Sequence, residues 1–144
     1  METRRGRNSV YQIAYHVVWC TKYRKPVLTS DVAAALKELL LKIAEDGGFT
    51  IEKLEVMPDH VHLFITAGPT HLPADMVKSL KGVSARFLFK KRPQLKQCLW
   101  GGHLWNPSYY LATVGSISED AVRKYIENQK GGWQDGQVSQ DQTV

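Results

Sequence analysis

Two histidines separated by one residue are the strongest chemical feature of this 144-residue sequence. His60 and His62 lie in residues 57–67 (MPDHVHLFITA), whose alternating pattern predicts a β-strand. Because side chains alternate across a strand, the histidines share one face, while Val61 and Leu63 share an apolar face. Two imidazoles side by side on a sheet can supply two nitrogen ligands to one metal ion. Two solvated surface histidines are the alternative, because a short His-x-His pattern is unspecific.

A tyrosine near the other end of the chain is the candidate nucleophile. Residues 116–129 have the apolar spacing of a helix, in which Tyr125 and Gln129 lie one turn apart on the same side. A tyrosine hydroxyl, with a pKa near 10, is a poor nucleophile at neutral pH unless a metal or a base assists it. A metal held by His60 and His62 could assist by polarising a phosphate. Taken alone, without the histidines, Tyr125 is more simply interpreted as an amphipathic packing residue.

The elements that must position these residues follow one another in a recognisable order. The pattern predicts strands at 10–20, 49–57 and 105–114 besides the histidine strand within 57–67, and helices from about 30 to 47 and from 73 to about 89. The order β-α-β-β-α-β predicts an α+β, ferredoxin-like (RRM-like) antiparallel sheet with its helices on one face. The other face then carries His60 and His62, and an extra C-terminal helix brings Tyr125 towards it. Gly115 is the predicted hinge, because glycine adopts backbone angles that other residues avoid.

Length and composition agree with one basic domain. A chain of this length with 43% hydrophobic residues can bury a core, and a net charge of +5 suggests a polyanionic partner without requiring one. We expect the domain to span residues 1–132 and the polar, glutamine-rich residues 133–144 to be a disordered tail. Cys20 and Cys98 lack metal-type spacing, and the chain shows neither a signal peptide nor a membrane-length apolar run. These features predict a cytoplasmic protein that does not enter a membrane.

Several motifs, taken together, resemble one family. They are residues 15–28 (YHVVWCTKYRKPVL), 58–63 (PDHVHL), 81–86 (KGVSAR), 113–115 (TVG) and 125–129 (YIENQ). In this order and spacing the chain resembles the single-tyrosine HUH (histidine, hydrophobic, histidine) transposases of bacterial insertion sequences. The resemblance covers nearly all of the chain up to Gly131, and the catalytic positions match throughout.

The resemblance implies a mechanism and a substrate. Tyr125 would attack a phosphate of single-stranded DNA that has hairpins near the element ends, leaving a 5′-phosphotyrosine and a free 3′-hydroxyl that can rejoin strands. His60, His62 and Gln129 would hold Mg²⁺ or Mn²⁺. The family also implies a homodimer in which the tyrosine helix of one subunit completes the site of the other. The sequence leaves open whether the site is completed within one chain or between two.

Basic, aromatic and hydroxyl side chains near the motifs are candidates for DNA contacts. Basic groups track phosphates, aromatic rings stack on unpaired bases, and we expect Lys78, Lys81 and Arg86 to point outward from their helix. For each of these residues an ordinary solvated surface is the alternative. The candidates are Lys22, Tyr23, Arg24, Lys25, Lys78, Lys81, Ser84 and Arg86.

Other functions remain open from the sequence. A domesticated relative of the REP-associated tyrosine transposases would cut chromosomal repeats, and a non-catalytic module for single-stranded nucleic acid would leave Tyr125 without a role. Metal-dependent hydrolysis is a weaker reading, because alternation places Asp59, the carboxylate beside the histidines, on the other face. His16 has the parity of the free face, where it is either near the site or a structural histidine.

Overall fold

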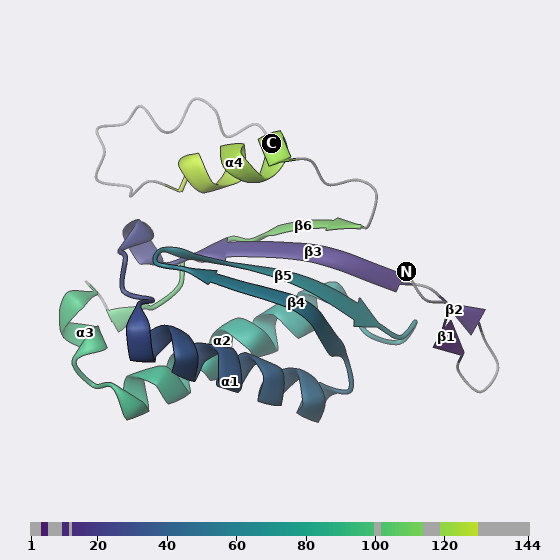
Figure 1. Cartoon of the computed structure of the whole chain (residues 1–144), viewed down its shortest axis with the longest axis horizontal. Helices are drawn as coiled ribbons and strands as arrows, with labels where there is room; N and C mark the ends of the chain where they lie inside the picture. The colour runs from purple at the N-terminus through teal and green to yellow at the C-terminus, as the bar shows by residue number, and fades with distance from the viewer. Residues whose placement is uncertain (1–3, 6–9, 12, 100–101, 114–118, 130–144) are drawn as a thin grey trace.

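The computed structural model describes residues 4–5, 10–11, 13–99, 102–113 and 119–129 (Figure 1). The helical elements are α1 (Ser30–Gly47), α2 (Pro73–Lys91), the short α3 (Leu95–Cys98), α4 (Glu119–Glu127) and the 3₁₀ turn η1 (Lys22–Arg24). The strands are β1 (Arg4–Arg5), β2 (Val10–Tyr11), β3 (Ile13–Cys20), β4 (Thr50–Met57), β5 (His60–Ala67) and β6 (Tyr110–Thr113). The predicted β-α-β-β-α-β order followed by a helix is confirmed from β3 onward.

The main sheet has four antiparallel strands in the order β4-β5-β3-β6. Two predicted strands were too long. The first predicted strand, residues 10–20, corresponds to two strands in the structure, β2 and β3. Strand β2 pairs with β1 in a small separate sheet, and β3 belongs to the main sheet. The last shrinks to β6, while Trp105 forms only an isolated bridge with Thr21. The ferredoxin-like α+β class is nevertheless confirmed.

One face of the sheet carries the core. Val17 and Trp19 of β3 and Leu63 of β5 are at most 1% exposed, and they pack against the buried side chains of α1 and α2, which lie together on this side (Figure 1). The helices present apolar residues at helical spacing, such as Leu36 and Leu40 of α1. Each fully buried side chain of this kind stabilises the fold by about 1.5–3 kcal/mol. This packing fixes the sheet and therefore the positions of the side chains on its opposite face.

Helix α4 lies on that opposite face, above β3 and β6 (Figure 1). Val18 and Cys20 of β3 are fully buried but lie outside the core cluster, on the side that α4 occupies. The second face is therefore partly covered instead of open. The predicted hinge at Gly115 and the predicted tail at residues 133–144 lie outside the described residues. No helix in the described part of the chain is both long enough and apolar enough to span a membrane.

Candidate metal-binding and nucleophile site

Strand register places both motif histidines on the face that carries α4. His60 lies opposite Cys20 of β3, and His62 lies opposite Val18 of β3 and Glu55 of β4. Directly opposed residues share a face, so the histidines point away from the core, as the alternation predicts. Their side chains are 19% and 29% exposed, which leaves them accessible at the surface of the sheet.

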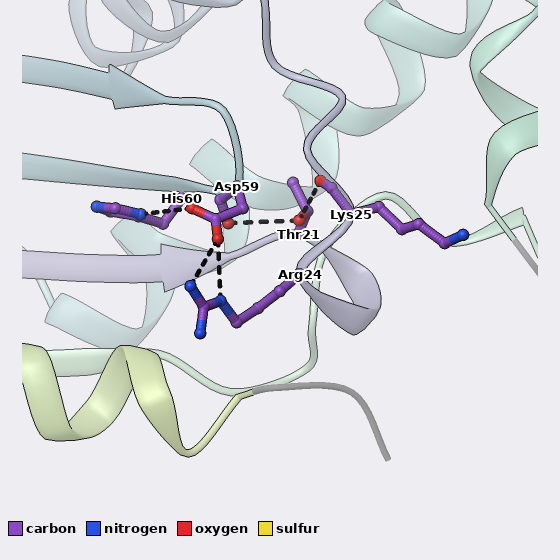
Figure 2. Close-up of polar contacts among 5 residues, drawn as sticks. All are labelled: Thr21, Arg24, Lys25, Asp59 and His60. Atoms are coloured by element: carbon purple, nitrogen blue, oxygen red, sulfur yellow. Dashed lines mark hydrogen bonds and ion pairs between the residues drawn. The ribbon is translucent and has the colours of Figure 1, made fainter. Parts of the chain in front are cut away.

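Asp59 contacts His60 directly, which corrects the expectation that its carboxylate lies on the other face. His60 Nδ1 is 2.8 Å from Asp59 Oδ1, and Arg24 donates from Nε and Nη2 to Asp59 Oδ2, each at 2.9 Å (Figure 2). Alternation fails because β5 begins at His60 and Asp59 belongs to the turn before it. Burial alone would raise the pKa of Asp59, but the hydrogen bonds from His60 and Arg24 outweigh it and lower that pKa below its usual range.

His62 has a looser environment. Its Nδ1 is 3.8 Å from Glu55 Oε1, too long for a hydrogen bond. Burial lowers the pKa of His62 and outweighs the opposing charge of Glu55, so the ring is neutral at neutral pH. Neutral imidazole is the form that binds metal. His16 lies beside it with ring centroids 5.6 Å apart, so the parity expected for His16 is confirmed.

The chemistry of these side chains fits a divalent ion. The contact of His60 Nδ1 with Asp59 leaves Nε2 as its available ligand atom. Within the described residues, no group of three or more His, Cys, Asp or Glu side chains is arranged to hold a metal ion. A site based on His60 and His62 therefore needs further oxygen ligands of another kind, such as an amide or a substrate phosphate. Mixed nitrogen and oxygen ligands with open positions suit Mg²⁺ or Mn²⁺ better than structural zinc.

Tyr125 and Gln129 meet at a serine that the sequence did not single out. The Ser108 and Tyr125 hydroxyl oxygens are 2.9 Å apart, and Ser108 Oγ donates to Gln129 Oε1 at 3.3 Å. Burial raises the pKa of Tyr125 to about 12, although the hydrogen bond with Ser108 partly opposes the shift. The phenol is therefore protonated at neutral pH. No local pattern could reveal Ser108, because its partners lie 17 and 21 residues away in the chain.

A groove of about 1050 Å³ runs between α4 and residues 108–111. Tyr125 and Gln129 line it, and the Tyr125 ring lies 6.0 Å from that of Tyr110. Tyr110 is paired with Val18, and Val18 is paired with His62. The groove and the histidines therefore share one face of the sheet, with β3 between them.

Three of the candidate DNA contacts are already engaged within the protein. Arg24 is paired with Asp59. Ser84 is fully buried and accepts a hydrogen bond from Trp105 Nε1, so the expectation that it contacts DNA was wrong. Lys81 was expected to point outward, but its Nζ donates to the carbonyl oxygens of Asn106 and Ser108 at 2.7 and 2.9 Å. Sequence periodicity placed these side chains on a helix face without showing what packs against it.

The other candidates have accessible side chains. Lys78 and Arg86 are exposed on α2, on the side of the sheet opposite the histidines (Figure 1). Lys25 is exposed beside η1, and Lys22 Nζ lies 5.2 Å from the centre of the Tyr23 ring. These five residues stay predicted DNA contacts.

The sequence and the fold of this chain match those of one family of transposases. A family model described as "Transposase IS200 like" matches residues 9–129. The chain belongs to the IS200-like transposase family, which confirms the resemblance seen in its motifs.

Two curated relatives and two solved structures agree with this assignment. The chain is 50% identical over 129 residues to the ISDra2 transposase TnpA of Deinococcus radiodurans, covering 90% of this chain and 92% of the relative. It is 28% identical to the transposase for insertion sequence element IS200 of Salmonella typhimurium, covering 83% and 81%. It superposes on a crystal structure of a candidate transposase from Deinococcus radiodurans with a TM-score of 0.84 at 49% identity, covering 89% and 98%. A REP-associated tyrosine transposase bound to a REP hairpin shares the fold, with a TM-score of 0.51 at 18% identity, covering 92% and 76%.

Proposed function

We propose that this transposase cleaves and rejoins single-stranded DNA at insertion-sequence ends through a 5′-phosphotyrosine on Tyr125. The observation that carries the proposal is the placement of Tyr125 and Gln129 on the same sheet face as His60 and His62. A nucleophile, an amide oxygen and two imidazoles on one face are the parts that metal-assisted phosphoryl transfer requires.

In the proposed reaction the Tyr125 oxygen attacks the scissile phosphorus and loses its proton. The bond from phosphorus to the 3′ oxygen breaks, and that oxygen leaves with the electron pair and becomes a 3′-hydroxyl. His60, His62 and Gln129 would hold Mg²⁺ or Mn²⁺, whose chemistry when bound is to polarise the phosphate and stabilise the leaving oxygen. Because one phosphodiester replaces another, a 3′-hydroxyl can reverse the step and join strands without a nucleotide energy source.

The proposed DNA substrate contains hairpins that the protein binds. The REP-associated neighbour was solved with a REP hairpin, and the exposed basic residues of this chain are suited to contact DNA phosphates. Lys78 and Arg86 are exposed on the face away from the histidines, so they would contact duplex phosphates at a distance from the scissile bond. Lys22, Tyr23 and Lys25 lie near the end of β3, closer to His60. They would contact the single strand.

The proposal includes a homodimer. Strand β6 is at one edge of the sheet, and an edge strand can pair with a strand of a second copy. Helix α4 lies above the sheet of its own chain (Figure 1), which supports a site completed within one chain. Exchange of α4 between subunits is the alternative, and a complementation experiment separates the two.

The first prediction is that Tyr125→Phe abolishes formation of a covalent protein–DNA adduct and leaves hairpin binding within about twofold, because only the nucleophilic oxygen is removed. The protein is incubated with Mg²⁺ and a single-stranded oligonucleotide carrying the DNA that flanks its gene, and adducts are resolved on denaturing gels. Tyr109→Phe is the matched control, because Tyr109 is exposed and lines the same groove.

The control variant is expected to form the adduct at the normal rate. Cleavage that persists in Tyr125→Phe would assign the nucleophile elsewhere. Cleavage of chromosomal repeat hairpins, but not of flanking DNA, would identify a domesticated repeat-processing enzyme. Hairpin binding without cleavage by the unmodified protein would favour a binding module.

A further inference from the structure

The turn before the first motif histidine is built around one carboxylate with both oxygens in use. Asp59 Oδ1 meets His60 Nδ1 at 2.8 Å, while Asp59 Oδ2 accepts both hydrogen bonds from Arg24 (Figure 2). The three side chains are only 19–24% exposed. An ionised carboxylate has no proton to donate, so the bond to His60 requires the proton to be on Nδ1.

The backbone holds this carboxylate in place from the opposite side. The Thr21 amide donates to the Asp59 carbonyl oxygen at 3.0 Å. The Thr21 hydroxyl has one proton, and its shorter contact is with the Lys25 carbonyl oxygen at 2.8 Å, which closes the η1 loop, while the Asp59 carbonyl oxygen at 3.3 Å is the alternative acceptor (Figure 2). Tyr23 and Arg24 have φ angles of 56° and 53°, a left-handed conformation that costs energy for residues with a Cβ. These strained residues include Arg24 itself, whose side chain pairs with Asp59.

We propose that Asp59, oriented by Arg24, is a positioning residue that fixes His60 with its proton on Nδ1 and its Nε2 lone pair available to a metal ion. The inference rests on the proposed function only in naming a metal as the partner of Nε2. A fixed tautomer removes the need to move a proton or turn the ring when a ligand binds, and a carboxylate on the far nitrogen makes the imidazole a more basic ligand.

Among the residues that the structure describes, no carboxylate supports His62 in the same way. Glu55 Oε1 is 3.8 Å from His62 Nδ1, and the Glu55 side chain is 73% exposed. The two histidines of the motif are therefore held unequally, and His60 is the preorganised one. This difference supplies a control within the same site.

The test measures the His60 tautomer by ¹⁵N NMR of the imidazole in metal-free protein at one fixed pH near 8, with His60→Gln used to assign its signals. The unmodified protein is expected to show a protonated Nδ1 and an unprotonated Nε2. Asp59→Ala is expected to shift the population towards a protonated Nε2, the form free imidazole prefers. Asp59→Asn retains an acceptor oxygen and should largely restore the original tautomer, and Arg24→Met should give an intermediate result.

Mn²⁺ affinity, measured by calorimetry, gives a second readout. Asp59→Ala is expected to weaken binding by about 10- to 100-fold. Glu55→Ala should leave the His60 tautomer unchanged. Asp31→Ala removes a different aspartate–arginine pair, formed with Arg92 at 2.9 Å, and should change neither readout.

An unchanged tautomer in Asp59→Ala would overturn the inference, as would the same loss in the Asp31→Ala control. If Asp59→Ala fails to fold, the Asp59→Asn and Arg24→Met results decide the question. Absence of Mn²⁺ binding by the unmodified protein would count against the proposed metal-dependent function. The tautomer measurement would still decide the role of Asp59.

Discussion

His16 has a buried polar atom that calls for an explanation. Its ring stacks on Phe64 with centroids 5.1 Å apart, and its Nδ1 has no hydrogen-bond partner among the residues that the structure describes. Burial, followed by the charge of Lys53, lowers the pKa of His16. The ring is therefore neutral at neutral pH and adds no positive charge beside His62. A neutral neighbour avoids like-charge repulsion with a cation at the histidine pair.

The two cysteines should differ sharply in reactivity. Burial raises the pKa of Cys20 to about 12, whereas Cys98 is exposed. Because the thiolate is the reactive form, Cys20 should be nearly inert at pH 8. We predict that Cys98→Ser leaves no thiol that reacts rapidly with a disulfide reagent in the folded protein, while Cys20→Ser retains one.

The rate of thiol reaction, followed by absorbance, measures this difference. Denaturant should equalise the two variants, because unfolding removes the burial of Cys20. Fast reaction of Cys20 in the folded Cys98→Ser protein would contradict the observed packing of this sheet face.

Lys81 connects α2 to the segment that leads into β6. Its ammonium group donates to the carbonyl oxygens of Asn106 and Ser108, and Ser108 in turn contacts Tyr125. Burial lowers the pKa of Lys81 to about 8. One side chain of the core-side helix thus helps to place the groove on the opposite face.

We predict that the free energy of unfolding of the unmodified protein increases relative to that of Lys81→Met as pH rises from about 7 to 9. In this window unfolded Lys81, with a pKa near 10.4, keeps its proton while folded Lys81 releases it. The unfolded state therefore binds more protons, and this group makes the folded state more stable as pH rises. The slope cannot exceed about 1.4 kcal/mol per pH unit for one proton.

Urea unfolding at several pH values measures this difference in the free energy of unfolding, and Lys78→Met is the matched control on the same helix. Lys78 is exposed, so its variant should follow the unmodified protein at every pH. Above about pH 9 the raised pKa of Cys20 acts in the opposite sense, because an unfolded thiol loses its proton first. A constant difference from pH 7 to 9 would show that Lys81 does not titrate there.

Sequence periodicity predicted the elements well where the pattern was long, and it placed His60 and His62 on the correct face. It failed for Asp59, because side-chain alternation was applied to a residue of the turn before β5. It also failed for Ser84, whose helix face is covered by Trp105 from a distant part of the chain. Ser108 shows the same limit, since its importance comes from contacts with α4. Contacts between distant segments leave no periodic trace.

The sheet divides the molecule into two sides that carry different groups of residues. Helices α1 and α2 cover one side of the sheet, while the histidines and α4 lie on the other (Figure 1). Exposed Lys78 and Arg86 are therefore apart from the candidate nucleophile. Under the proposed function, a hairpin could stay bound on one surface while a single strand is cut on the other.

A mixed dimer tests how the proposed site is completed. If α4 of one subunit completes the histidine site of the other, Tyr125→Phe chains mixed with His60→Ala chains should regain part of the activity that each lacks. One composite site then holds both substitutions and the second holds neither, so about half of the sites are intact. A site completed within one chain gives no recovery.

The measurement is strand cleavage by co-expressed, doubly tagged heterodimers, compared with each parental homodimer. Recovery to about half of the unmodified activity would establish exchange between subunits. Confirmed heterodimers without activity would exclude it. Purified protein that stays monomeric in the presence of hairpin DNA would remove the homodimer from the proposed function.

The hydroxyl of Ser108 has only one proton, and this limits where the proton of Tyr125 can go. Ser108 Oγ has two amide acceptors, Gln129 Oε1 at 3.3 Å and Asn106 Oδ1 at 3.2 Å, and when it donates to either of them the phenol is the donor in its bond with Ser108. Both routes end on an amide oxygen, which does not accept a proton at neutral pH. Within the described ranges of the chain, these hydrogen bonds from Ser108 therefore lead to no base that could take the phenolic proton. In the proposed reaction the phenolic proton therefore passes to an acceptor outside this hydrogen-bonded set, and water and a phosphate oxygen of the DNA substrate are acceptors that the reaction itself supplies.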